Sequence, residues 1–121
     1  MGKSILKDKS FAFAKSVVSL YQLLVTERKE FVMSKQLLRS GTSVGAMIRE
    51  AQNAESKMDF VHKLSIAQKE CDEACYWLEL LFETGYLEQH LTHEISGKAD
   101  EIIRMIKSAI LTTKSNLTNK E

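Results

Sequence analysis

The chain has 121 residues, of which 44% are hydrophobic and 27% are charged, and its formal net charge is +1. This length suits one domain with one core, and the near-neutral balance argues against a strongly basic nucleic-acid binder and against an acidic disordered tail. There is no proline, and the five glycines are too few for the many turns of an all-β fold, so the composition favours long helices.

The sequence shows neither a membrane-spanning segment nor a signal peptide, and these absences bear on its cellular location. No apolar run reaches the roughly 18 residues of a membrane span, and the first ten residues lead into no apolar signal-peptide core. The two cysteines, Cys71 and Cys75, suit a reducing compartment. We therefore expect a cytoplasmic protein without a membrane partner.

The first predicted helix covers about residues 10–28. Its apolar residues recur at the helical period, and Ser10 is the expected N-cap. The expected core positions are Phe13, Val17, Leu20, Tyr21 and Leu24.

The second predicted helix, 32–53, contains two glycines four residues apart, although an interior glycine costs roughly 1 kcal/mol relative to alanine. Because glycine has no Cβ, we expect Gly41 and Gly45 to let a neighbouring helix approach closely. Arg39, Ser43 and Glu50 fall on the other side of this helix. Arg39 and Glu50 are about 16 Å apart along the axis, so each needs a partner from another helix or subunit. The other core positions are Met33, Leu37, Val44, Ile48 and Ala51.

The third predicted helix, 56–84, has two faces that both carry apolar residues. Ser56 is expected to cap it, with Asp59 three residues later, and Gly85 is expected to end it. One stripe, from Phe60 to Phe82, forms the core. A second set lies roughly 100–160° away and contains Ile66, Glu73, Trp77, Leu80 and Thr84. This set is either part of a broad core covered by the 85–91 segment or a subunit interface.

The fourth predicted helix, about 92–116, repeats apolar residues at intervals of three and four. All three connections are short. This favours an all-α fold in which residues 1–121 form one antiparallel up-down-up-down four-helix bundle.

Residues that could carry chemistry are sparse. Cys71 and Cys75 give at most half of a zinc site, and we interpret them as buried structural thiols. No Glu-x-x-His motif of a di-metal bundle occurs, and the GTSVG stretch lacks the Lys-Ser/Thr of a phosphate-binding loop. We therefore expect no catalytic, cofactor or metal site.

Basic residues give weak support to nucleic-acid binding, because surface lysines that merely aid solubility are at least as common. A ring of subunits would repeat any small basic patch and raise its binding by multivalency. The candidate residues are Lys3, Lys7, Lys9 and Lys15 near the start and Arg104, Lys107 and Lys114 on the fourth helix.

The segment from Gln36 to Leu81 resembles the four-helix-bundle family of 23S rRNA-intervening-sequence proteins. Its pattern is Arg-Ser-x-x-Ser-Val-x-Ala, then Glu-Ala, Asp-Phe-x-x-Lys, Lys-Glu and Trp-Leu-x-Leu-Leu. Members often have Asn after the first Ala, where this chain has Met47, so any hydrogen bond from that Asn is absent or replaced. The matching residues are Arg39, Ser40, Ser43, Val44, Ala46, Glu50, Ala51, Asp59, Phe60, Lys63, Lys69, Glu70, Trp77, Leu78, Leu80 and Leu81.

The resemblance implies a bacterial protein that assembles into a homopentameric ring, without an established biochemical role, and often encoded inside insertions in large-subunit rRNA genes. A similar fold occurs in the accessory protein of diversity-generating retroelements, a basic pentamer that works with a reverse transcriptase and nucleic acid. On this basis the expected subunit interface contains Ile66, Glu73, Trp77, Leu80, Arg39, Ser43 and Glu50.

Three functional hypotheses follow. The leading one is a non-enzymatic, homo-oligomeric adaptor or accessory factor that associates with RNA or an RNA–protein partner and is encoded with ribosomal RNA insertions or mobile elements. The second is a metal-dependent or hydrolytic bundle enzyme that uses Glu50, Glu70, Glu73 and His62. The third is a passenger protein of a mobile element that has no ligand.

Overall fold

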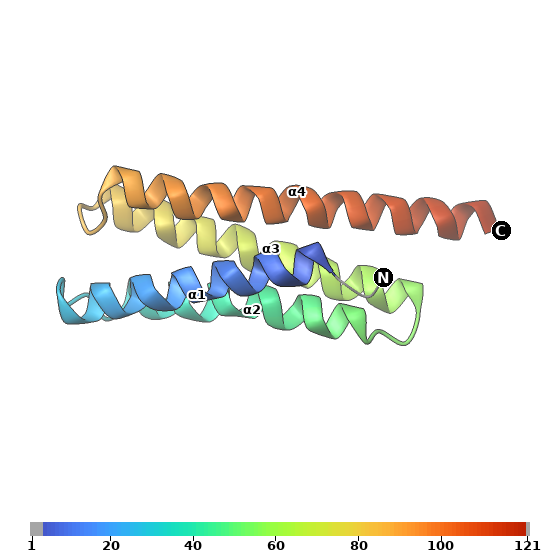
Figure 1. Cartoon of the computed structure of the whole chain (residues 1–121), viewed down its shortest axis with the longest axis horizontal. Coiled ribbons are helices and arrows are strands. Elements are labelled where there is room, and N and C mark those ends of the chain that lie inside the picture. Colours follow the sequence, from blue (N-terminus) through green and yellow to red (C-terminus); the bar gives the residue numbers. More distant parts are fainter. Residues whose placement is uncertain (1–3, 121) are drawn as a thin grey trace.

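The computed structural model describes the backbone of residues 4–120 and the side chains of residues 4–117. Its helices are α1 (Ile5–Thr26), α2 (Met33–Gln52), α3 (Lys57–Glu83) and α4 (Gln89–Lys120). They lie along the long axis of an elongated molecule, and the ribbon turns back at each connection (Figure 1). The prediction of an all-α fold with four helices is confirmed.

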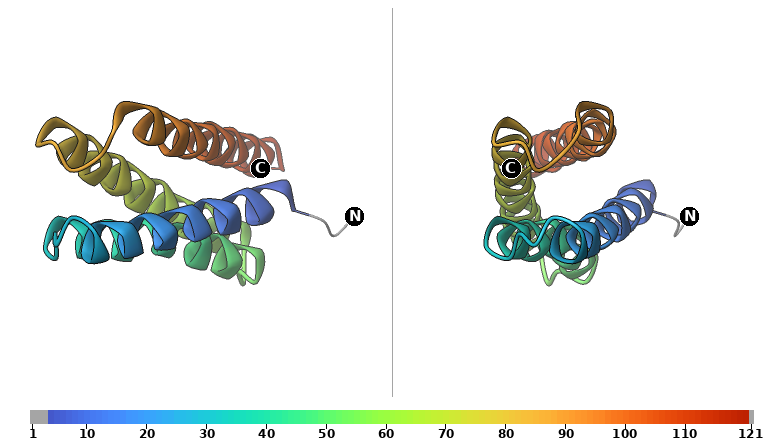
Figure 2. Two further views of the ribbon diagram at one scale, coloured as in Figure 1. Left: turned by 60° about the vertical axis from the view of Figure 1, so that its left-hand side comes forward. Right: turned by 90° about the vertical axis from the view of Figure 1, so that its left-hand side faces the viewer.

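The four helices surround one core. α1 and α2 lie side by side, α4 lies on the other side of the molecule, and α3 crosses obliquely from α2 towards α4 (Figure 2). Each helix packs against its neighbours in the chain, and α1 also packs against α4. The contact between α2 and α3 is the most extensive of these.

The core is built from the apolar stripe of each helix. α1 contributes Phe13, Val17, Leu20 and Leu24, all buried, whereas Tyr21 is half-buried. The buried apolar residues of the other helices and connections are Leu37, Val44, Ile48, Ala51, Leu64, Ala67, Cys71, Ala74, Leu78, Leu81, Leu87, Ile95, Ala99, Ile102 and Ile106. Burial of these stripes is the main favourable contribution to folding.

Helix α1 begins earlier than its expected cap. Ser4 is the N-cap, and its Oγ accepts a hydrogen bond from the Lys7 N–H at 3.0 Å. Ser10 is buried inside the helix, and its hydroxyl donates to the Lys7 carbonyl at 3.0 Å, so the expectation that it caps the helix is wrong. Leu6 packs against the core one turn before Ser10, which extends the amphipathic pattern towards the start of the chain.

The ends of α3 and the start of α4 are set by side-chain caps and a glycine. Ser56 caps α3 by accepting from the Asp59 N–H at 3.0 Å, and Gly85 follows the helix with a φ of 89°, as the sequence predicts. α4 begins at Gln89 rather than near Thr92, because the Glu88 carboxylate accepts a hydrogen bond from the Leu91 N–H at 2.8 Å.

Helix α2 has a cap that the sequence reading missed. The carboxylate of Glu30, which is only 7% exposed, accepts hydrogen bonds from the backbone N–H groups of Val32, Met33 and Ser34 at 2.7–3.1 Å. Burial raises the pKa of the Glu30 carboxyl, but the N–H groups of Met33, Ser34 and Val32 outweigh it and hold this pKa below its ordinary value. The buried acid therefore satisfies several N–H groups at the start of α2 at once.

The connection between α3 and α4 packs on one end of the core. Leu87 in this connection is buried and Tyr86 is half-buried against the core, as is Leu91 in the first turn of α4. Arg28 ties this connection to the end of α1 by donating to the carbonyls of Gly85 and Tyr86 at 3.1 and 2.9 Å, and its guanidinium lies over the Tyr86 ring.

No helix in residues 4–120 is long and apolar enough to pass through a bilayer.

Candidate functional site

An ion cluster joins the outer sides of α2 and α3. Arg39 on α2 forms hydrogen-bonded ion pairs with Glu70, at 3.2 Å, and with Glu73, both on α3. The indole Nε1–H of Trp77 donates to the same Glu73 carboxylate at 3.1 Å. Four residues of the family pattern or the candidate interface are thus brought together by the packing of α2 on α3.

The electrostatics of this cluster follow from its hydrogen bonds. The bond to Glu73, with the charges of Glu73 and Glu70, raises the pKa of the Arg39 guanidinium. Arg39 and then the Trp77 indole hold the pKa of the Glu73 carboxyl below its ordinary value. Glu73 therefore stays ionised and anchors two neighbours at neutral pH.

A second ion pair lies nearer the α2–α3 connection. Lys63 donates to the Glu50 carboxylate at 3.1 Å, and this bond raises the pKa of Lys63. Arg39 and Glu50 cannot reach each other, as expected from their spacing, and each has a partner on α3 of the same chain. The sequence allowed for either another helix or another subunit, and within one chain α3 provides both partners.

Two further pattern residues have local roles. Ser43 is half-buried, and its hydroxyl donates to the Arg39 carbonyl at 2.7 Å, one turn back in α2. The Asp59 carboxylate accepts from the Glu55 N–H at 3.3 Å at the start of α3. Val44 is buried, and Phe60 and Met47 are half-buried against the core.

The second apolar face of α3 is only partly covered within one chain. Ile66, Trp77 and Leu80 are half-buried, and Trp77 packs against the edge of the core. Tyr76 is 55% exposed, and its ring meets that of Trp77 edge to face with 4.9 Å between centroids. Tyr76 and Leu80 also border a hollow of about 210 Å³ on the outside of α3, whose other lining residues are Glu79 and Glu83. This leaves an aromatic and aliphatic surface open to a partner.

The two glycines of α2 differ in their surroundings. A Cβ on Gly41 would lie 2.8 and 2.9 Å from the two methyl carbons of Val17 on α1, closer than atoms in contact can be. A Cβ on Gly45 would meet only Ser10, at 3.5 Å, an ordinary contact. Gly41 therefore marks a close approach of α2 to α1, whereas Gly45 has room for a methyl group.

The predicted basic residues are divided between two helices. Lys3 lies outside the described residues, and Lys7, Lys9 and Lys15 lie along α1. Lys9 is bound to Glu101 of α4 at 3.1 Å, which partly neutralises it. Arg104, Lys107 and Lys114 lie on α4, apart from the α1 set in sequence and on another helix.

The residues considered for metal chemistry are dispersed. Within the described part of the chain, no three His, Cys, Asp or Glu side chains come together in a way that could hold a metal ion. Glu70 and Glu73 hold Arg39, and Glu50 holds Lys63. Cys71 is buried and its thiol donates to the Ala99 carbonyl at 3.6 Å; the neighbouring Cys75, together with burial, raises the pKa of the Cys71 thiol.

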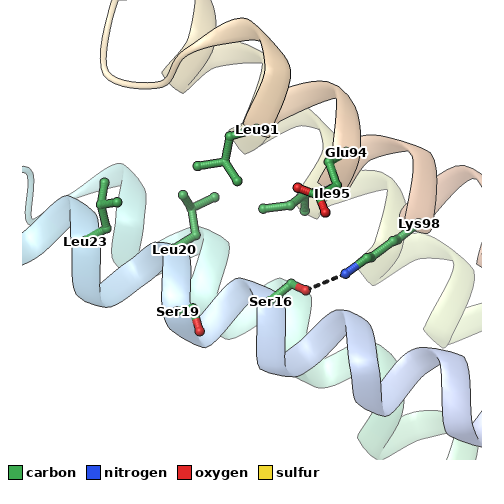
Figure 3. Close-up of a pocket in the computed structure, with 8 residues that line it drawn as sticks. All are labelled: Ser16, Ser19, Leu20, Leu23, Leu91, Glu94, Ile95 and Lys98. Carbon is green, nitrogen blue, oxygen red and sulfur yellow. Dashed lines mark hydrogen bonds between the residues drawn. The ribbon is translucent and has the colours of Figure 1, made fainter.

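A cavity of about 250 Å³ separates α1 from α4 near one end of the molecule (Figure 3). Its walls include Leu20, Leu91 and Ile95, and Lys98 at its border donates a hydrogen bond to Ser16 at 2.8 Å across the two helices. This cation is therefore bonded within the protein, and the hollow is mainly an apolar gap in a loose helix contact.

Sequence reasoning missed one further feature of the surface. The ring of Phe11 on α1 lies under two cations, Lys15 and Arg49, which are contributed by different helices. Arg49 directly precedes Glu50 of the family pattern, yet neither it nor Phe11 belongs to a recognisable motif. In the sequence, only the presence of both basic and aromatic residues in α1 could have indicated that Phe11 lies beside cations.

Comparisons with known proteins identify a matching family and a similar solved structure. The model of the family described as 23S rRNA-intervening sequence protein matches residues 3–108. The crystal structure of a protein with unknown function from the S23 ribosomal protein family of Bacteroides thetaiotaomicron is similar, with 53% identity and a TM-score of 0.87. That match covers 88% of this chain and 98% of the other. No curated protein matches the chain.

Proposed function

Because the chain belongs to the family of 23S rRNA-intervening sequence proteins, we propose that it is a non-enzymatic, homo-oligomeric adaptor that binds RNA or an RNA–protein partner. Its unit is an antiparallel up-down-up-down bundle, its assembly is a homopentameric ring, and it acts in the cytoplasm. The ring size and the link to RNA come from the family resemblance.

The observation that carries this proposal is the open apolar face of α3. Tyr76 is exposed, and Trp77 and Leu80 are only half-covered by their own chain. Aromatic side chains at the centre of a contact give the largest losses on truncation, often 2 kcal/mol or more. A second copy that covers this face would bury all three side chains, and the hollow beside Tyr76 and Leu80 offers a place for a protruding side chain.

The ion cluster gives this interface a defined border. Arg39, Glu70 and Glu73 lie beside Trp77 and are already paired, so a neighbouring subunit meets a polar rim with one excess negative charge. A polar rim around an apolar centre is typical of specific protein interfaces.

Light scattering tests the assembly. Five copies of the 13.7 kDa chain would weigh five times 13.7, or 68.5 kDa, whereas a mass of 13.7 kDa at micromolar concentration would overturn the proposal. The Tyr76→Ser and Leu80→Ser variants should reduce the mass. Leu111→Ser is the matched control, because it also removes an exposed apolar side chain but on α4.

Trp77→Ala tests the anchor directly. Because Trp77 also packs against the core, circular dichroism must first show that this variant is folded. A folded variant should form the oligomer more weakly by a few kcal/mol. A folded variant with an unchanged mass distribution would exclude Trp77 as an anchor.

RNA binding is tested by titrating labelled RNA into the purified protein at two salt concentrations. Binding through phosphates should weaken steeply as salt rises. If the assembled protein binds no RNA even at low salt, the RNA part of the proposal is wrong. A pull-down from native extract, with and without nuclease, would then show whether a protein partner remains.

A further inference from the structure

The groove between α1 and α2 presents an exposed aromatic ring among cations. Phe11 is 51% exposed, and both the Lys15 Nζ and the Arg49 Cζ lie 5.3 Å from the centre of its ring. Lys7 borders the same groove. Leaving half of a phenyl ring in water is unfavourable, and cation–π attraction at an exposed site offsets only about 0.5–1 kcal/mol.

The groove has room for a flat group beside Phe11. It encloses about 330 Å³, and three small residues, Ala14, Gly45 and Ala46, line it. Its remaining polar side chains are satisfied inside the protein, since Ser10 donates to the Lys7 carbonyl and Thr42 to the Leu38 carbonyl. The groove is therefore apolar with a cationic border.

The cations beside Phe11 form no ion pair within the described part of their own chain, although Arg49 also lines a neighbouring hollow with Glu50, Glu55 and Asp59. Among the side chains of residues 4–117, no carboxylate lies within ion-pair distance of Lys7, Lys15 or Arg49, and no acidic residue lines the groove. Arg39 and Lys63, by contrast, are both paired with glutamates of their own chain. Two unpaired cations at the ring and a third in the groove attract an anionic ligand that has a flat apolar part.

We propose that this groove binds single-stranded RNA, with one base stacked on Phe11 and the adjoining phosphates held by Lys7, Lys15 and Arg49. This inference rests on the proposed RNA-binding function, and it adds where the RNA binds and that the bound RNA is single-stranded. In a duplex the bases are stacked on each other and their faces are closed to a side chain, so an aromatic platform selects unpaired nucleotides.

The charges favour RNA over a second copy of the chain as the occupant. A docked helix would remove three cations from water, which is costly unless the helix brings matching carboxylates. A nucleic-acid strand brings one phosphate for each nucleotide and a base that every aromatic ring can stack on.

Phe11→Leu is the decisive variant, because it keeps an apolar side chain and removes the ring. The probe is a fluorescein-labelled twelve-nucleotide oligouridylate, followed by fluorescence anisotropy at low salt. Stacking is worth about 1–3 kcal/mol per base, so the Kd should rise about 5- to 150-fold. Phe31→Leu is the matched control, since Phe31 is 57% exposed, and its Kd should stay unchanged. Phe11→Trp should retain binding.

The salt dependence of RNA affinity tests the proposed phosphate contacts. The logarithm of affinity falls with the logarithm of salt by about 0.7 for each phosphate contact with a single strand. Arg49→Gln and Lys15→Gln should each reduce this slope by about that amount, whereas Lys35→Gln on the exposed side of α2 should not change it. A duplex of the same length should bind more weakly and respond little to Phe11→Leu.

The outcomes separate this inference from the proposed function. If the wild-type protein binds no RNA at low salt, the proposed RNA-binding function fails and this site fails with it. If the wild type binds but Phe11→Leu and Phe31→Leu bind equally well, only the site is wrong. If Phe11→Leu lowers the mass in light scattering, the groove is a subunit contact and the proposed RNA site is overturned.

Discussion

The two glycines of α2 should respond to alanine in opposite ways. In Gly41→Ala the new methyl group would lie 2.8 and 2.9 Å from the methyl carbons of Val17. Val17 is fully buried and β-branched, so it cannot turn away without disturbing its neighbours. In Gly45→Ala the nearest atoms are those of Ser10 at 3.5 Å, and nothing needs to move.

The magnitudes follow from two opposing effects. Replacing an interior helix glycine by alanine gains about 0.8–1 kcal/mol from helix propensity. Overpacking a filled core costs about 1–3 kcal/mol. Gly41→Ala should therefore lose up to about 2 kcal/mol, whereas Gly45→Ala should gain about 1 kcal/mol. For 121 residues, an unfolding entropy of about 2.1 cal/mol/K per residue turns each 1 kcal/mol into about 4 °C of Tm.

Thermal and urea denaturation at one fixed protein concentration would measure both variants, because assembly makes the midpoint depend on concentration. Adding Val17→Ala to Gly41→Ala should relieve the clash. The free energy of unfolding of the double variant should therefore be about 0.5–3 kcal/mol higher than the value expected if the effects of the two single substitutions were additive. If Gly41→Ala stabilised the protein as much as Gly45→Ala, the close approach of α1 and α2 at Gly41 would be refuted.

Three other predictions concern ionisable groups. Glu30→Gln should lose about 0.5–2 kcal/mol at pH 7. The folded pKa of Glu30 is below its ordinary value of 4.5, so this stability is present above pH 4.5 and is lost as pH falls through the folded pKa. The difference in unfolding free energy between the wild type and Glu30→Gln should therefore narrow from pH 7 to pH 3 in urea titrations, and an unchanged difference would contradict the cap. In Arg39→Gln the pKa of Glu73 should rise towards its ordinary value, and an NMR titration that shows no rise would exclude the ion pair in solution. Native protein should alkylate at Cys75 before Cys71, because Cys71 is buried and its thiol pKa is raised; mass spectrometry that finds Cys71 labelled first would contradict this burial.

The helical faces were predictable because the relevant physics is local. A residue three or four positions away lies on the same side of a helix, so the positions of Phe13, Leu37 and Leu64 along the chain already indicate which side is buried. Boundaries were less certain, since several nearby serines can act as a cap. The structure selects Ser4 over Ser10 because Leu6, between them, also packs against the core.

The candidate site was predictable only in part. The pattern shows that Arg39 and Glu50 are too far apart to pair, but it does not show which helix faces them. Their partners Glu73 and Lys63 follow from the register in which α2 packs on α3, which depends on how all the core side chains fit together.

The sequence by itself determined that this protein is helical, which side of each helix is apolar, and which family it resembles, since all three depend on residue type and local spacing. Only the tertiary structure decided that Gly41 and not Gly45 lacks room for a Cβ, because that depends on where Val17 of another helix lies. It also decided that Phe11 and Arg49 meet in one groove. Contacts between residues distant in the chain depend on helix packing, and no local pattern encodes them.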